Sequence, residues 1–410
     1  MSRLPLRGLL HHPGYAVFVA GATLARVANE MFAVGVVLHV LERTGSPGLA
    51  GITLASVTLP SFVSGPLLGA WLDLTGRRRT LMVLNQCLMV VTVGALLLFA
   101  GVVPDWTLPL FGVVAGVTYP LSFGGFTSLI PSLVPEELLT PANALETSSF
   151  NAALIAGPAL AGTLAGLFGP AAALTTEIAL TAAALVLILR VRGLDKEPNE
   201  TPEEDSLWRV ARAGLRQIVE VPQLRGVTFT GALNLGGFGL FTVAFPFFAV
   251  ELGGERSQAG YMWAAFALGS TLGALIVARY QDRLHSERVV LAGVGGAGLA
   301  ILLWPLAPSL TVALALIALA GLFDGPGLAA TFAVRQERVP ARLHGQVFTT
   351  AASLKVGSFA LGAALAGPAV LGLGVGGALV AAGLTQLVAV AGGALLMRVR
   401  ASERVAAAPG

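Results

Sequence analysis

Charged residues are scarce in this chain of 410 residues. Asp, Glu, Lys and Arg together make up 11% of the sequence, whereas hydrophobic residues make up 55%. A soluble globule of this size needs far more polar side chains to cover its surface. The composition therefore excludes a soluble protein and indicates a chain that lies within a lipid bilayer.

Cysteine and lysine are almost absent. The single cysteine, Cys87, excludes an internal disulfide and says little about the compartment. The two lysines are Lys196 and Lys355, and neither is followed by Ser or Thr. A nucleotide-binding loop of the Walker type requires Gly-Lys followed by Ser or Thr. Energy for any work must therefore come from an ion gradient, from the gradient of a substrate, or from a separate subunit.

Long apolar stretches fill most of the remaining sequence. About 20 residues of helix cross a hydrocarbon core of about 30 Å, and twelve stretches approach or exceed this length. The sequence therefore predicts an all-α membrane protein with twelve transmembrane helices. The predicted spans are approximately 13–41, 48–72, 80–101, 107–130, 142–166, 171–191, 223–250, 258–280, 288–307, 311–334, 343–368 and 373–396.

Basic residues are distributed by membrane side rather than gathered in one patch, so binding to nucleic acid is not expected. If both termini lie in the cytoplasm, 21 of the 25 Lys and Arg residues fall on the cytoplasmic side. The inverted topology reverses this ratio. The rule that basic loops stay inside therefore predicts cytoplasmic N and C termini in a bacterial-type inner membrane.

The chain contains an internal repeat. Residues 134–162 align without a gap with residues 339–367, and nine of the 29 aligned positions are identical. A second match, between residues 65–70 and 269–274, has almost the same offset. Repeats of this length in an apolar chain point to a duplicated transporter.

The repeat and the polar stretch between spans six and seven divide the chain. We predict an N-terminal six-helix bundle at 1–192, a cytoplasmic linker at 193–222, a C-terminal six-helix bundle at 223–397 and a cytoplasmic tail at 398–410. Within the linker, residues 207–221 carry apolar side chains near one helical face, which indicates an amphipathic helix on the membrane surface. A simple solvated connector is the alternative.

A glycine and arginine motif follows the second predicted span. Gly69, Asp73 and Gly76 precede the run Arg77, Arg78 and Arg79. This loop resembles the signature of the major facilitator superfamily, although Leu74 stands where that family usually has a basic residue. The resemblance implies two pseudo-symmetric six-helix bundles around a central cavity. It also implies that Gly69, Asp73, Gly76, Arg77 and Arg78 form a latch between the halves, whereas the arginines alone could serve as topology anchors.

A second motif lies in the fifth predicted span, where Gly157 and Pro158 are followed by Gly162. It is similar to a motif of exporters in the same superfamily, with Ala161 in place of one family glycine. Proline bends a helix and small residues let a neighbour approach closely. The resemblance implies export rather than uptake, and a small-residue packing face is the alternative.

Ionisable residues inside apolar spans are costly and are candidates for function. Arg26 and Glu30 share a face of the first span, where they could pair with each other. The resemblance implies that Glu30 is the carboxylate that exchanges a proton, since many similar exporters carry Asp there. Arg26, Glu177, Asp324 and Lys355 are the other candidates for proton coupling. A structural pair between Asp324 and Lys355 is the alternative for these two. Candidates for the substrate cavity are Asn29, Asn234, Phe241 and Phe245, and phenylalanine facing lipid is equally consistent with the sequence.

Together these features predict a secondary active transporter rather than an enzyme, with no cofactor and no metal site. The leading hypothesis is proton-coupled export of amphipathic small molecules, such as drugs or secondary metabolites, by a monomer that works by alternating access. The coupling ion could also be Na⁺. The alternatives are an uptake symporter or uniporter for a small polar metabolite, and a protein that translocates lipid or transports nothing.

Overall fold

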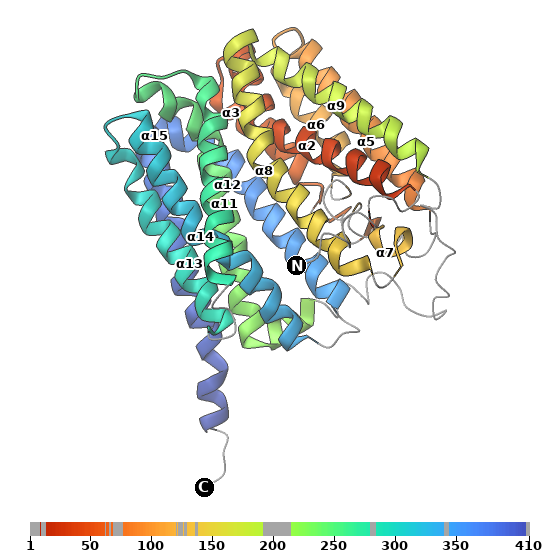
Figure 1. Ribbon diagram of the computed structural model, residues 1–410. Coiled ribbons are helices and arrows are strands. Elements are labelled where there is room, and N and C mark those ends of the chain that lie inside the picture. The colour runs from red at the N-terminus through yellow and green to blue at the C-terminus, as the bar shows by residue number, and fades with distance from the viewer. Residues whose placement is uncertain are drawn as a thin grey trace. The chain divides into compact units, whose positions relative to one another are not determined.

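The computed structural model of the chain is shown in Figure 1. It describes residues 9, 14–61, 63–64, 67–68, 77–119, 121, 126, 129–135, 138–191, 215–278, 284–339 and 344–406. Within these residues all regular secondary structure is helical. The prediction of an all-α fold is confirmed.

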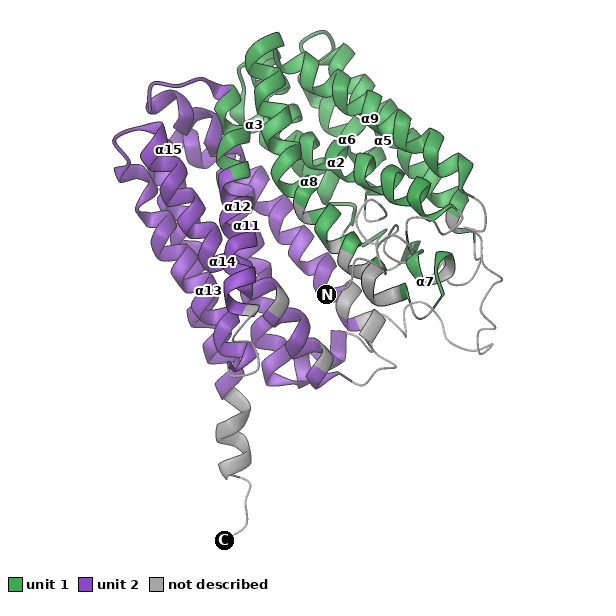
Figure 2. Cartoon of the chain, in the orientation of Figure 1, with its two compact units in different colours: residues 1–203, 257–264 green, residues 204–256, 265–410 purple. Residues whose placement is uncertain are grey.

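The chain divides into two compact units, coloured separately in Figure 2. Unit 1 comprises residues 1–203 together with 257–264, and unit 2 comprises residues 204–256 and 265–410. The predicted boundaries of the linker and of the tail stay predictions, because much of these segments lies outside the described residues.

Unit 1 contains seven described helices. They are α2 (Tyr15–Thr44), α3 (Pro47–Thr58), α5 (Arg78–Phe99), α6 (Leu108–Gly116), α7 (Ile130–Leu133), α8 (Leu139–Phe168) and α9 (Pro170–Arg190). Unit 2 contains α11 (Pro222–Glu251), most of α12 (Ala259–Ala278), α13 (Ser286–Leu302), α14 (Leu310–Arg338) and α15 (His344–Ala406).

Local sequence sets several helix ends. Ser46 accepts a hydrogen bond from the backbone N–H of Leu49 at 3.1 Å and so caps the start of α3, where Pro47 occupies the first turn. Gly45 ends α2 with a φ of 68°, a left-handed conformation that glycine adopts without strain. The chain therefore turns sharply between α2 and α3.

Nine helical segments in the described part of the chain are long and apolar enough to cross a membrane. One of them, Thr350–Arg398, covers both the eleventh and the twelfth predicted spans. Gly374, with φ 74° and ψ 173°, breaks the helical conformation inside α15 and separates the two. Helices α3 and α6 cover only parts of the second and fourth predicted spans, so the count of twelve stays a prediction.

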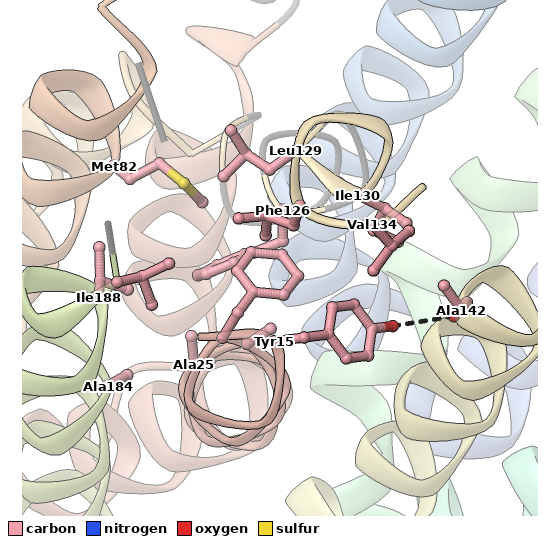
Figure 3. Packing of buried hydrophobic residues seen from close by; sticks show 14 of the residues in the cluster. Tyr15, Ala25, Met82, Phe126, Leu129, Ile130, Val134, Ala142, Ala184 and Ile188 are labelled. Carbon is pink, nitrogen blue, oxygen red and sulfur yellow. Dashed lines mark hydrogen bonds between the residues drawn. The ribbon is translucent and has the colours of Figure 1, made fainter. Parts of the chain in front are cut away.

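Helix α2 is the centre of unit 1, where it packs against α8 and α9. Gly21 lies against Leu187 and Gly35 lies against Leu174, both of α9, so that an added Cβ would come within 3.2 Å and 3.0 Å of these side chains. At the other end of α2, Tyr15 and Phe18 pack with Phe126 in a buried apolar cluster (Figure 3). These contacts bury more of α2 than of any other candidate span in the described chain.

Unit 2 is held together chiefly by α11 on α15. Gly362 of α15 lies directly on the backbone of Gly236, and Gly239 lies on the backbone of Phe359, so neither glycine has room for a Cβ. Helix association in lipid depends on such close packing, because lipid chains are as apolar as the helices themselves. Small residues therefore determine where α11 and α15 meet.

The segment Gly325-Pro326-Gly327 does not interrupt its helix. Helix α14 continues from Leu310 to Arg338 with Pro326 inside it. Proline also lies inside α8 and α11, at Pro158 and Pro246. Each removes one backbone donor without ending the helix, which neighbouring helices make tolerable in a membrane protein.

The close contact at Gly362 predicts a specific loss of stability. We expect Gly362→Ala to destabilise the protein by about 1 to 3 kcal/mol, because the new Cβ forces α15 away from α11. The control is Gly372→Ala, at a glycine of the same helix with open space around it. The measurement is thermal unfolding in detergent, and equal melting temperatures for the two variants would contradict the packing described.

Candidate functional site

A buried ion pair joins the first span to the fifth. The guanidinium of Arg26 on α2 pairs with the carboxylate of Glu146 on α8, and both side chains are almost completely buried. Arg26 also donates a hydrogen bond of 2.8 Å to the hydroxyl of Ser149, and its guanidinium lies 5.7 Å from the centre of the Phe126 ring. Arg26 is therefore held from three sides.

Aromatic side chains surround this pair. In Figure 3 the ring of Tyr15 points from α2 toward α8, where its hydroxyl donates to the carbonyl of Ala142 at 3.4 Å. Glu146 lies one helical turn further along α8. The arrangement shields the ion pair from lipid and from solvent, which is the setting in which removal of one partner is most costly.

The pair that the sequence allows between Arg26 and Glu30 is not formed. Arg26 turns to Glu146 instead, because a carboxylate on a neighbouring helix can meet the guanidinium together with the Ser149 hydroxyl. Within the described residues, no cation pairs with Glu30. The side chain of Glu146 is itself buried.

Glu30 lies where α2 and α8 are in close contact. A Cβ on Gly157 would lie 2.5 Å from the Cβ of Glu30 and 3.0 Å from the carbonyl oxygen of Val27. Glu30 is partly exposed, whereas its neighbour Asn29 is buried beside the hydroxyl of Tyr119. The first glycine of the predicted exporter motif therefore contacts the residue that carries the predicted proton carboxylate.

Glu177 is a second acidic side chain of unit 1 without a cation. It lies on α9, 1% of it is exposed, and neither carboxyl oxygen has a hydrogen-bond partner in the described part of the chain. Tyr119 is within electrostatic range of both Glu177 and Glu30. Unit 1 thus brings two carboxyl groups and one phenol into the same neighbourhood.

Unit 2 has a polar group of its own. The amide of Asn234 on α11 donates to a carboxyl oxygen of Asp324 on α14 at 2.8 Å. Gln386 on α15 donates to the backbone carbonyl of Asn234 at 3.1 Å. Lys355 on α15 is within electrostatic range of Asp324 and of Arg335, but neither forms a direct hydrogen bond or ion pair with it among the described residues. The predicted pairing of Asp324 with Lys355 is therefore electrostatic rather than a direct contact.

Comparison with known proteins identifies the family. The family model of transmembrane secretion effectors, a major facilitator family, matches residues 10–409. The chain belongs to the major facilitator superfamily. It is 31% identical over 399 residues to an uncharacterized MFS-type transporter, y4rN, of Sinorhizobium fredii. The aligned region covers 94% of this chain and 96% of y4rN. It is thus a membrane transporter for small molecules rather than an enzyme.

Two further proteins are similar over most of their length. The multidrug efflux pump Tap of Mycolicibacterium fortuitum is 28% identical over 370 residues, or 86% of this chain and 87% of Tap. The crystal structure of the nucleoside transporter NupG superposes with a TM-score of 0.74 at 10% identity and covers 93% of this chain and 99% of NupG. The latter likeness shows the major facilitator fold.

Most of the predicted major facilitator latch falls outside the described residues. Gly69, Asp73 and Gly76 lie there. Arg77 is exposed at the start of α5, and Arg78 is the first residue of that helix. The proposed latch therefore stays a prediction.

The exporter motif is described in full. Gly157 contacts Glu30, and Pro158 lies inside α8 with its carbonyl against Gly260. Gly162 also lies against Gly260, in the short segment 257–264 that belongs to unit 1. Both glycines of the motif are thus points of close backbone packing.

Phe241 and Phe245 of α11 are fully buried. Their rings stack with centres 4.9 Å apart, and Trp304 packs on both at 5.3 Å and 5.5 Å. In this structure they contribute to the core of unit 2, and their predicted role in binding substrate stays a prediction. In the described part of the chain, no group of His, Cys, Asp or Glu residues could hold a metal ion.

The buried pair of Arg26 and Glu146 predicts a large effect on stability. We expect Glu146→Gln to destabilise the protein by about 3 kcal/mol or more, because it leaves the buried guanidinium without a counter-charge. Glu220→Gln is the control, since Glu220 pairs with Arg216 on an exposed surface, where such pairs contribute little. Thermal unfolding in detergent measures both, and a Glu146→Gln protein as stable as the control would contradict the structural role.

Proposed function

We propose that this transporter is a proton-coupled exporter of amphipathic small molecules and that Glu30 binds and releases the coupling proton. The observation that carries the proposal is that Glu30 lies within a membrane span and that its carboxyl group has no cation paired with it among the described residues. The residue is partly exposed. Such a group can bind a proton without first breaking an ion pair.

The two acidic side chains at the contact of α2 with α8, Glu30 and Glu146, differ in whether a cation is paired with them. Glu146 is compensated by Arg26, so its charge is fixed and its role is structural. A carboxylate such as Glu30, in apolar surroundings without a cation, is most easily neutralised by taking up a proton. The same argument supports Glu177 as a second proton-binding candidate.

Coupling also requires that protonation changes a helix contact. Gly157 lies against the Cβ of Glu30, and Pro158 follows it directly in α8. Proline weakens a helix locally because it removes one backbone hydrogen bond. We propose that the charge on Glu30 determines how closely α2 approaches α8 beside Pro158.

Export is favoured over uptake by the family and by one relative. The matching family is described as secretion effectors, and Tap is named a multidrug efflux pump. One charge moved across about 100 mV is worth about 2.3 kcal/mol, which exceeds the 1.4 kcal/mol needed for a tenfold gradient. A single proton at Glu30 therefore suffices to concentrate a substrate more than tenfold.

The remaining features of the proposal follow from the sequence. We propose a multi-pass protein of the bacterial inner membrane with cytoplasmic termini, because basic residues gather on that side. The loop from Gly69 to Arg78 is proposed as the latch between the halves. Protons, rather than Na⁺, are proposed as the coupling ion because an unpaired carboxyl group is sufficient to bind one.

Replacement of the proposed proton carboxylate should abolish coupling. We expect Glu30→Gln to reduce transport driven by a pH gradient at least tenfold in proteoliposomes, because glutamine cannot exchange a proton. Glu42→Gln, an exposed position on the same helix, should transport like the wild type. The assay follows a panel of amphipathic dyes, and the protein should remain monodisperse in detergent.

Unchanged proton-driven efflux in Glu30→Gln would overturn the assignment of Glu30. Accumulation of substrate in the same direction as the proton would instead support the uptake alternative. Movement of labelled phospholipid without a gradient would support the lipid alternative.

The glycine beside Glu30 gives an independent test. We expect Gly157→Ala to slow proton-driven transport by tenfold or more, because the added methyl group displaces Glu30. Gly94→Ala is the matched control, at a helical glycine of unit 1 with open space around it. Equal transport rates in the two variants would show that the contact of α8 with Glu30 has no part in coupling.

A further inference from the structure

Lys355 is the one lysine within a membrane span, and its ammonium group has an unusual setting. An ammonium group has three N–H donors. Among the described residues none of them meets a hydrogen-bond acceptor, although Asp324 is near enough for electrostatic attraction. Lys355 is only partly buried.

The surroundings of Lys355 fix its position. Its side chain lies along Gly231 of α11, where an added Cβ would be 3.5 Å from Cε and 3.8 Å from Nζ. Two charged residues of α14 act on it: Arg335 repels its charge and Asp324 attracts it. The ammonium group is therefore directed to the region shared by α11, α14 and α15 of unit 2.

Among the described residues, the acidic side chain near Lys355 already has a hydrogen-bond donor. Asp324 accepts the hydrogen bond of 2.8 Å from the Asn234 amide, and Asn234 is in turn fixed by Gln386, which is completely buried. Asp324 thus balances part of the charge of Lys355 but supplies no direct contact to it. A charged ammonium within a span is unfavourable without full compensation, and an anionic group would supply the acceptor that it lacks among the described residues.

We propose that Lys355 binds the anionic group of the transported molecule, so that the substrates of this exporter are amphipathic organic anions such as carboxylates. A lysine ammonium binds anions as a compact point charge with freely oriented donors. The stem of Lys355 is packed on Gly231, which orients the charge. The anionic group of the substrate completes the coordination that Asp324 leaves open.

This inference rests on the proposed export function but concerns binding alone. The test therefore uses equilibrium binding to the full-length protein in detergent, with no gradient. The probes are 2-naphthoate and 2-naphthamide, which have nearly the same size and differ in charge. The ratio of their dissociation constants, measured on one preparation, does not depend on the fraction of folded protein.

We expect the wild type to bind naphthoate about tenfold or more tightly than naphthamide, as one charge-assisted hydrogen bond in a partly buried site provides. Lys355→Met should lose this preference and keep the binding of naphthamide. Lys355→Arg should retain the preference. The same ratio in the wild type and in Lys355→Met overturns the proposal.

A second variant separates binding from a structural role. Asp324→Asn removes the negative charge that competes for Lys355, so we expect the preference for naphthoate to increase severalfold. A purely structural lysine predicts no increase, and that result counts against the proposal. The ratio is measured without a gradient, so failure of proton coupling and failure of anion binding are distinguishable.

A lipid headgroup carries the same kind of charge as the proposed substrate. The third probe is therefore dihexanoyl phosphatidylglycerol, a short-chain anionic phospholipid. Competition between this lipid and naphthoate that depends on Lys355 supports a shared anion site. Binding of the lipid that depends on Lys355, without any such dependence for naphthoate, overturns the assignment of Lys355 to the substrate.

Discussion

Close approach of helix backbones at glycine is the constraint on which the rest of the structure depends. In lipid, helices gain little from burying apolar side chains. The positions where a glycine lets two backbones approach closely therefore determine which helices pack together. The repeat places such a contact in each half: Gly157 lies on Glu30 in unit 1, and Gly362 lies on Gly236 in unit 2. The duplicated glycine is thus used twice in the same way. Only in unit 1 does its partner carry a carboxyl group, so the duplication has preserved the packing but not the chemistry.

The ionisable side chains within the spans are stabilised in three different ways. Arg26 has a counter-charge on a neighbouring helix. Asp324 has a neutral hydrogen-bond donor, the amide of Asn234. Among the described residues Glu30 has neither, and Lys355 has only the electrostatic attraction of Asp324 without a direct contact. Both residues are partly exposed. These arrangements differ in how readily a charge can be neutralised by a proton or bound by a ligand. The charges with a direct partner are held in place, whereas those of Glu30 and Lys355 remain open to a proton or a ligand.

Much of the fold could be predicted from the sequence, because apolar length and the distribution of arginines report directly on the bilayer. The partners of the buried charges could not be predicted in this way. Arg26 shares a helix face with Glu30, but its partner Glu146 is 120 residues away and is brought to it only by the packing of α2 on α8. Likewise, the phenylalanine pattern of α11 does not distinguish a cavity wall from the buried stack that Phe241 forms with Trp304. Pairing across helices depends on rotation and register, which apolar periodicity does not specify.

The proline inside α14 has a consequence for a neighbouring helix. Pro326 has no N–H, so the carbonyl oxygen of Leu322 does not receive the helical hydrogen bond that another residue at position 326 would donate. Gly273 of α12 lies directly against that oxygen. A glycine Cα–H is a weak donor to a carbonyl, and such contacts recur between closely packed helices. The carbonyl oxygen that the proline leaves without a donor is thus the point at which α12 packs on α14. At this point polar backbone atoms hold the two helices together without any polar side chain.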